Sequence, residues 1–508
     1  MILVIDFGSQ YNQLIARRVR ENRVYCRIEP PDITAAEVAA MKPDGIILSG
    51  GPSSIYEDES PQMDTAVLEM GIPILGICYG MQFLALAMGG EVTRSEKREY
   101  GRADLIIREK GSLLKDVRDT RCWMSHGDSI ETLPRGFSAI ALTRNTKIAA
   151  AENPEKKIYG LQFHPEVAHT PDGVKIMRRF IFDVCGCEPS WTMKKFAADS
   201  IEKIREKVGD KKVILGLSGG VDSSVTASLV QAAIGSRLTC VFIDNGLLRE
   251  NEALDLKKTF KKNIASKIRL VSAKRKFLSA LSKVTDPEKK RKIIGRIFVD
   301  VFEAEAQKIK GVEFLAQGTI YPDVIESKSA HGGPSAVIKS HHNVGGLPER
   351  MKLKLIEPLN SLFKDEVREL GLELGLDEGL IWRHPFPGPG LAIRIMGAVT
   401  QKKLSLLRKV DAILLDEIEK NKYGRKLWQA FAVLLPIKTV GVMGDKRTYD
   451  HIAAIRAVTS KDAMTADWAR LPHDLLAEIS NRIINEVDGI NRAVYDITSK
   501  PPGTIEWE

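Results

Sequence analysis

Cysteine is scarce in this chain of 508 residues, which contains six. Such a low content excludes a disulfide-stapled scaffold and indicates a reducing compartment. Long hydrophobic runs are also missing, because no apolar stretch approaches the roughly 18 residues that a membrane span needs. The beginning, MILVIDFGSQ, enters a strand pattern at once and has no basic region followed by an apolar one. We therefore expect a cytoplasmic protein with no membrane partner.

Signatures of nucleic-acid binding are absent as well. The chain has no zinc-finger spacing, no basic tail and no interleaving of aromatic with basic residues. Its 75 Lys and Arg against 66 Asp and Glu give a net charge of +9. These positive charges are scattered, with one denser stretch, KKRKIIGR, at Lys289–Arg296. A scattered excess suits a solvated surface or anionic small molecules such as nucleotides, so we expect no nucleic acid partner.

Short apolar runs that end in glycine-rich turns, as buried parallel strands do, organise the chain into blocks. The first block, residues 1–187, contains ILVIDFG, DGIILSGG and IPILGIC. The break CEPSW precedes a second alternating block, which we assign to residues 188–383. It ends at RHPFPGPG, because neither a helix nor a central strand accepts so many prolines and glycines. Residues 384–508 form the third block.

The main chemical motif of the first block surrounds Cys78. The sequence PILGICYG predicts a strand, a sharp turn and a helix, with Gly76 and Gly80 flanking the cysteine as in a nucleophile elbow. A helix amino terminus favours the thiolate, which is the reactive form. His164 and Glu166 lie two residues apart at a strand end and can share one face. We expect Cys78 to be the nucleophile, His164 its base and Glu166 the acid that orients the imidazole.

An oxyanion hole is predicted at the neighbouring glycine turn SGGP, whose backbone N–H groups are free of Cβ interference. Its donors are the N–H groups of Gly51 and Tyr79. DFGSQ, ILSGGPSS, GICYGMQ and FHPEV resemble the class I glutamine amidotransferase family across about 187 residues. This resemblance implies that Cys78 attacks the side-chain amide of glutamine and that His164 moves the proton. It also implies that a thioester forms and ammonia leaves.

A second candidate site lies in VILGLSGGVDSS, where a strand, a glycine turn and a helix follow one another. Backbone N–H groups at the helix start form an anion cradle, to which Ser218, Ser223 and Ser224 add hydroxyls. Asp222 would repel phosphate there unless it holds Mg²⁺, so we expect that ion. The chain contains no G-x-x-x-x-G-K-[ST] motif, which argues against γ-phosphoryl transfer of the Walker type.

The SGGxDS pattern resembles the ATP-pyrophosphatase (PP-loop) family, which cleaves ATP between the α- and β-phosphates and adenylylates its substrate. The resemblance places the adenosine near Asp244–Gly246. A later stretch, SKSAHGGPSAVIKSHHNVGG, has the composition of a mobile lid, from which we expect Lys339 to bring charge to the phosphates. The residues predicted to bind ATP are Ser218, Gly219, Gly220, Val221, Asp222, Ser223, Ser224, Asp244 and Lys339.

A source of ammonia and an adenylylating ATPase in one chain make an amidating ligase, because AMP is a leaving group that ammonia can displace. HPFPGPGLAIR, LPIKTVGVMGDKRTYD and ITSKPPGTIEWE are closely similar to the family of glutamine-hydrolysing GMP synthetases. The expected fold class is α/β with two parallel-sheet domains and a small α+β domain. These are an amidotransferase domain (1–187), a PP-loop synthetase domain resembling adenine-nucleotide hydrolases (188–383), and a C-terminal domain for dimerisation and XMP binding (384–508).

In that family, xanthosine monophosphate (XMP) attacks the α-phosphate of MgATP, and ammonia then displaces AMP to give GMP. The resemblance implies ATP, XMP and glutamine as substrates, Mg²⁺ as cofactor and a homodimer formed through the C-terminal domain. It also implies that XMP is bound by Arg291, Asp445, Lys500 and Glu506, with the 441–447 loop nearby.

Two other classes of function stay open. One is a different PP-loop ligase, NAD-synthetase-like or RNA-thiolating, although thiolation usually needs cysteines in a block that here contains only Cys240. The other is a nucleotide-sensing or RNA-binding protein without catalysis. Cys78, His164, Glu166 and Asp222 argue against it, because pure binding needs no nucleophile.

Overall fold

The computed structural model describes residues 1–9, 11–52, 54–57, 59–118, 120–263, 267–324, 353–443, 445–460 and 465–508. Lys339, His341, His342 and Gly444 lie outside these residues. The chain divides into two compact units, Met1–Thr192 and Met193–Glu508. In the described ranges, no helix has both the length and the apolar character needed to cross a bilayer.

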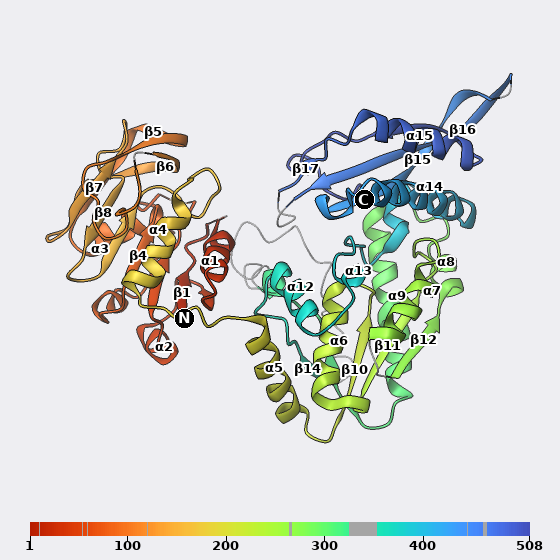
Figure 1. Ribbon diagram of the computed structural model, residues 1–508, viewed down its shortest axis with the longest axis horizontal. Helices are drawn as coiled ribbons and strands as arrows, with labels where there is room; N and C mark the ends of the chain where they lie inside the picture. Colours follow the sequence, from red (N-terminus) through yellow and green to blue (C-terminus); the bar gives the residue numbers. More distant parts are fainter. Residues whose placement is uncertain are drawn as a thin grey trace. The chain divides into compact units, whose positions relative to one another are not determined.

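The amino-terminal unit is built on a nine-stranded sheet of order β2-β1-β3-β4-β9-β8-β7-β5-β6 (Figure 1). Its strands are β1 (Ile2–Ile5), β2 (Cys26–Glu29), β3 (Gly45–Leu48), β4 (Ile74–Ile77), β5 (Glu91–Ile107), β6 (Thr120–Thr132), β7 (Ser138–Leu142), β8 (Ala150–Asn153) and β9 (Ile158–Leu161). Its helices are α1 (Asn12–Glu21), α2 (Ala35–Met41), η1 (Thr65–Glu69), α3 (Tyr79–Ala87), α4 (Gly173–Arg179) and η2 (Phe180–Val184). The pairings from β2 to β9 are parallel, as the apolar runs predict. The antiparallel strands beyond β9 extend this predicted sheet.

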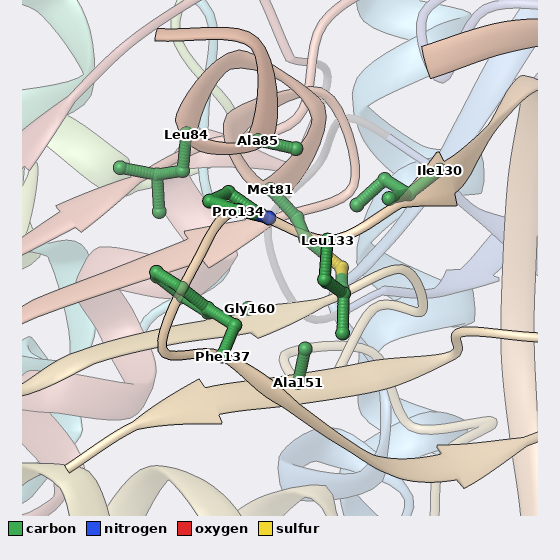
Figure 2. Close-up of a pocket in the computed structure, with 9 residues that line it drawn as sticks. All are labelled: Met81, Leu84, Ala85, Ile130, Leu133, Pro134, Phe137, Ala151 and Gly160. Atoms are coloured by element: carbon green, nitrogen blue, oxygen red, sulfur yellow. The ribbon is translucent and has the colours of Figure 1, made fainter. Parts of the chain in front are cut away.

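Every residue of β1, β3, β4 and β9 is buried. Because successive side chains point to opposite faces, such strands need cover on both faces, which explains their unbroken apolar sequences. Helix α3 packs closely on β9, where a Cβ added to Gly160 would lie 2.5 Å from Met81 Cγ. Figure 2 shows a small apolar pocket between this helix and the sheet. It is lined by Met81, Leu84, Ala85, Ile130, Leu133, Pro134, Phe137, Ala151 and Gly160.

The second unit begins with a five-stranded parallel sheet of order β12-β11-β10-β13-β14 (Figure 1), which confirms the second predicted parallel-sheet part. Its strands are β10 (Lys212–Leu217), β11 (Leu238–Asp244), β12 (Lys267–Ser272), β13 (Val312–Ala316) and β14 (Lys354–Ile356). The accompanying helices are α5 (Met193–Val208), α6 (Val221–Ile234), η3 (Gly235–Arg237), α7 (Glu252–Asn263), α8 (Lys274–Ala280), α9 (Pro287–Gln307), α12 (Lys364–Glu373) and α13 (Glu378–Ile381).

The end of the chain forms a mainly antiparallel sheet with two longer helices, as expected for an α+β domain. It consists of η4 (Gly390–Arg394), α14 (Gln401–Lys420), η5 (Gly424–Lys426), β15 (Gln429–Met443), β16 (Lys446–Thr459), β17 (Asp467–Trp468), α15 (His473–Glu486) and β18 (Ile490–Tyr495). The far end of the β15–β16 hairpin projects beyond α14 and α15 (Figure 1). One hydrophobic core joins Ile214 and Val241 of the parallel sheet to Leu407 of α14 and Ile455 of β16. The boundary between residues 383 and 384 stays a prediction.

Candidate active sites

Cys78 stands at the turn between β4 and α3, as PILGICYG predicts. Its φ is +51°, a left-handed value that residues other than glycine rarely adopt. Two glycines leave room for the turn. A Cβ added to Gly76 would lie 2.7 Å from the carbonyl oxygen of Gly80, and one added to Gly80 would lie 2.5 Å from that of Leu48. The strained backbone therefore lifts the cysteine out of the sheet at the start of a helix.

His164 and Glu166 follow β9 and are both buried. The imidazole Nδ1 lies 2.7 Å from Glu166 Oε1. The His164 N–H donates to the carbonyl oxygen of Trp123 at 2.9 Å, which fixes its backbone. A Cβ added to Gly50 would lie 3.1 Å from His164 Cε1 and 3.6 Å from Cys78 Cβ, so both side chains flank the same glycine. The structure thus brings together the three residues predicted to form a cysteine triad.

The electrostatics of this group favour a charged pair. Burial of the imidazole opposes its protonation, but the Glu166 carboxylate and the Cys78 sulfur raise the pKa of His164 well above its ordinary value. A protonated imidazole beside sulfur favours the thiolate. Because the folded pKa exceeds the unfolded value of about 6.5, the interaction stabilises the fold fully below that pH. Its contribution is lost as the pH rises through the folded pKa of His164.

The two predicted oxyanion donors lie close together. A Cβ added to Gly51 would lie 3.2 Å from Tyr79 Cγ, so the glycine turn packs against the first residue of α3. The next N–H along the helix, that of Gly80, donates to the carbonyl oxygen of Ser49 at 3.0 Å. Within the described part of the chain, the N–H groups of Gly51 and Tyr79 have no hydrogen-bond partner. They are therefore available to a substrate oxyanion.

Sequence reasoning missed Gln162, a fully buried residue whose Nε2 donates to Cys78 Sγ at 3.7 Å. Its Oε1 accepts from Gln82 Nε2 at 3.3 Å, which orients the amide. The i, i+2 alternation that links His164 to Glu166 extends back to Gln162 and could have revealed it. A donor aimed at the sulfur supports its negative charge.

The second candidate site is the 218–224 loop, by which we mean the turn that follows β10 together with the first four residues of α6. Gly219 has a φ of +83°, and a Cβ there would lie 2.6 Å from Leu256 Cδ1. The hydroxyls of Ser218 and Ser223 lie 3.0 Å apart, and Ser224 Oγ donates to the Gly220 carbonyl at 2.9 Å. These bonds hold the loop in shape at the first turn of α6, and the backbone N–H groups of a helix start are suited to bind an anion.

Asp222 in this loop forms an ion pair with Lys364, the first residue of α12. Sequence reasoning missed this lysine, because it lies 142 positions away along the chain and belongs to no local motif. The 218–224 loop has no lysine of Walker type in its own sequence, but Lys364 on a distant helix places its ammonium group beside Asp222. Arg383 was missed too, and its Nη1 donates to the carbonyl oxygen of Gly219 at 3.1 Å.

Asp244 ends β11, the parallel neighbour of β10. Carboxyl ends of adjacent parallel strands meet at one edge of the sheet, so Asp244 and the 218–224 loop share the edge where open α/β sheets bind ligands. Asp244 Oδ1 accepts the N–H of Gly246 at 3.0 Å, and Oδ2 lies 3.1 Å from Lys274 Nζ. Lys339 lies outside the described residues.

Of the residues implied for XMP, Arg291 on α9 donates to the main-chain oxygen of Glu508 at the end of the chain. Glu506, two residues earlier, accepts from Arg394 Nη2 and Gln429 Nε2, each at 2.8 Å. Arg291 and the chain end that carries Glu506 therefore meet. Arg394 and Gln429 are partners that sequence reasoning missed.

Lys500 is held through its backbone, whose N–H donates to the carbonyl oxygen of Ala466 at 2.7 Å. Asp445 lies in the turn between β15 and β16, where it is exposed and has a φ of +60°. In the part of the chain that the structure describes, it forms no hydrogen bond or ion pair with Arg291 or Glu506. The role of Asp445 in binding XMP therefore stays a prediction.

Comparison with family models agrees with both sites. The model described as glutamine amidotransferase class-I matches residues 3–184, NAD synthase matches 193–296, and GMP synthase C terminal domain matches 416–507. The fold and sites define a class I glutamine amidotransferase joined to a PP-loop synthetase.

Full-length relatives narrow this class. The chain is 56% identical over 508 residues to "GMP synthase [glutamine-hydrolyzing]" of Brachyspira hyodysenteriae, covering 100% of this chain and 99% of the relative. It is 58% identical over 512 residues to the protein of the same name from Nitratiruptor sp., with the same coverage. The chain belongs to the family of glutamine-hydrolysing GMP synthases. The solved structure of "a putative gmp synthase subunit a protein" from Thermoplasma acidophilum is 32% identical, covers 36% of this chain and 93% of its own, and gives a TM-score of 0.33.

Proposed function

We propose that this chain converts XMP, ATP, glutamine and water to GMP, AMP, pyrophosphate and glutamate. The observation that carries the proposal is the presence of a cysteine triad and a PP-loop in one chain that matches GMP synthases along its full length. On this assignment, residues 1–187 release ammonia, residues 188–383 adenylylate XMP, and residues 384–508 contribute to XMP binding and dimerisation.

In the glutaminase half, the Cys78 thiolate attacks the side-chain carbonyl carbon of glutamine. The N–H groups of Gly51 and Tyr79 stabilise the oxyanion, and His164 gives its proton to the departing ammonia. Water then attacks the thioester while His164 takes up a proton, which releases glutamate and restores the thiolate. Glu166 keeps the imidazole oriented and supports its charge throughout.

In the synthetase half, O2 of XMP attacks the α-phosphate of ATP, and pyrophosphate leaves. The N–H groups of the 218–224 loop, its serine hydroxyls and Lys364 are suited to hold the pyrophosphate, because they are donors or cations at one helix start. Ammonia then attacks C2 of the adenylylated base, and AMP departs with the bonding electron pair. Arg291, Lys500 and Glu506 are our candidates for XMP contacts, and Asp445 stays a prediction.

Mg²⁺ is the cofactor that we assign to the ATP site. Asp222 fits such an ion, because its Oδ1 is buried and, among the described residues, has no hydrogen-bond partner. One carboxylate suffices when the substrate phosphates and water complete the coordination of Mg²⁺. When bound, the ion would neutralise phosphate charge. Asp222 would hold it, while Lys364 balances the second oxygen of the same carboxylate.

Substitution of Glu166 by glutamine should lower glutamine hydrolysis on the order of 100-fold, because the imidazole loses its oriented anionic partner. The raised pKa of His164 should fall. The protonated imidazole that gives its proton to the departing ammonia then deprotonates at a lower pH than in the wild type. The alkaline limb of the pH–rate profile should therefore move to lower pH. Glu155→Gln, an exposed substitution in the same unit, is the control. An unchanged profile for Glu166→Gln would contradict its role.

The homodimer that we propose uses the outer part of the β15–β16 hairpin. Ile437, Val440, Val442 and Tyr449 are 54%, 52%, 71% and 58% exposed there. Val440 pairs with Tyr449 across the strands, so these side chains share a face with Val442. Val442→Asp should convert the dimer to monomer in sedimentation velocity, because a charge enters an apolar interface. Val174→Asp, at a 48% exposed site in the other unit, should leave it dimeric.

The deciding assay incubates the full chain with XMP, MgATP and either glutamine or ammonium. We expect loss of XMP absorbance with equal amounts of GMP, AMP and pyrophosphate from both nitrogen sources. Ammonium bypasses the glutaminase, so no turnover with ammonium would overturn XMP as the acceptor. A screen of NAD precursors and tRNA would then follow, since the NAD synthase model matches part of the chain.

A further inference from the structure

The loop that follows β11 is held from outside the parallel sheet. Three consecutive carbonyl oxygens of this loop accept hydrogen bonds from the last part of the chain. Arg408 on α14 donates from Nη2 to Gly246 at 2.6 Å and from Nε to Leu248 at 2.9 Å. The carbonyl between them, that of Leu247, accepts the N–H of Leu391 at 2.8 Å.

A second contact of α14 reinforces the first. Asp411, one helical turn after Arg408, is almost fully buried, and its Oδ2 lies 3.0 Å from Arg249 Nε at the end of the same loop. Asp411 Oδ1 accepts the N–H of Ala432 on β15 at 3.0 Å. Positions i and i+3 lie on one helix face. One face of α14 therefore contacts the loop and, through Asp411, also bonds to the C-terminal sheet.

The contacts of Arg408 fix the direction of the peptide groups around Gly246. Its planar guanidinium reaches two carbonyls two residues apart, which a single-point donor cannot do. Asp244 and Gly246 open the same loop, and their mutual hydrogen bond sets its first turn. The backbone that we place beside adenosine therefore takes its course from a helix about 160 residues further along the chain, since Arg408 and Gly246 are 162 positions apart.

We infer that Arg408 is a positioning residue for ATP, through which the C-terminal part of the chain shapes the adenosine side of the adenylylation site. The inference rests on the proposed function for the place of the adenosine. Arg408 itself is not expected to touch the nucleotide. It holds the loop that does, and small misplacements of such a loop weaken binding and catalysis strongly.

The test compares full-length Arg408→Ala, Arg408→Lys and Lys409→Ala in ammonia-dependent synthesis, and measures ATP affinity directly by calorimetry. Lys409 is the exposed neighbour on α14 and serves as the matched control. For Arg408→Ala we expect the KM and the Kd for ATP to rise about 10-fold or more, because two charge-assisted hydrogen bonds are lost. The KM for XMP should change less than about twofold, and Arg408→Lys should restore part of the ATP affinity.

Equal rises in both KM values, or an unchanged ATP affinity in a variant that unfolds at the wild-type temperature, would overturn the inference. If Arg408→Ala does not fold, Arg408→Lys carries the same test, because lysine reaches one carbonyl at a time. Failure of the proposed function can be told apart from failure of this inference, because the wild-type chain would then make no GMP from ammonium. The calorimetric comparison of ATP binding still decides the role of Arg408 in that case.

Discussion

Cys78→Ala should abolish glutamine-dependent GMP formation and leave ammonium-dependent formation at the wild-type rate. The substitution removes the atom that attacks glutamine but touches nothing in the synthetase half. We expect a loss of more than about 1,000-fold with glutamine, as for the removal of other catalytic nucleophiles. The measurement is GMP formed from XMP and MgATP with each nitrogen source in parallel.

Cys122→Ala is the matched control, because Cys122 is another buried cysteine of the same unit and has no triad around it. Burial raises the pKa of Cys122 to about 12, so its thiol stays protonated and unreactive near neutral pH. Alkylation by iodoacetamide should accordingly inactivate the glutamine-dependent reaction of the wild type and leave the ammonium-dependent one. Glutamine use retained by Cys78→Ala would refute the nucleophile assignment.

The amidotransferase site was the easier one to find from sequence, because its signals are local. A strand, a tight glycine turn and a helix occupy the few residues around Cys78, and His164 and Glu166 are two positions apart. Such short-range patterns follow from strand alternation and from the steric needs of a turn. The three side chains come from two elements whose pairing, β4 beside β9, is the only long-range step.

The synthetase site was only partly predictable. The 218–224 loop has a local signature, but Lys364, Arg383 and Arg408 reach it or its neighbour from 142 to 164 positions away. Hydropathy and turn patterns report on positions within a few residues and contain no information on which distant helix packs against a strand end. A lone lysine or arginine in the sequence looks like any solvated charge. Tertiary packing alone turns it into a partner of the loop.

The antiparallel strands β5–β8 show the same limit in the fold. The apolar runs of β1, β3 and β4 predict buried parallel strands, because every residue in them is apolar. In β6, buried and partly exposed residues alternate, so its hydrophobic residues do not form a run. Such a strand is recognised by alternation, and its partner is set by register across the sheet and not by local sequence.

Asp222→Asn should lower synthesis with glutamine and with ammonium alike, by at least about 100-fold. The reason is that the substitution removes the carboxylate charge that we propose holds Mg²⁺ at the phosphates. The substitution keeps the size of the side chain but leaves Lys364 without its anionic partner. AMP and pyrophosphate formation with ammonium, over a range of Mg²⁺ concentrations, is the measurement. Asp210→Asn, at an exposed position before β10, is the control.

Asp222→Asn should impair the synthetase site and leave the glutaminase site intact, which is the reverse of Cys78→Ala. Because Cys78 and its triad lie in the other compact unit, iodoacetamide should alkylate Cys78 at the wild-type rate in Asp222→Asn. A loss of both alkylation and synthesis would point to misfolding and not to the chemistry of the loop. Full synthetic activity in Asp222→Asn would remove the carboxylate from the magnesium site and leave Lys364 and the loop N–H groups as the pyrophosphate-binding residues of the chain.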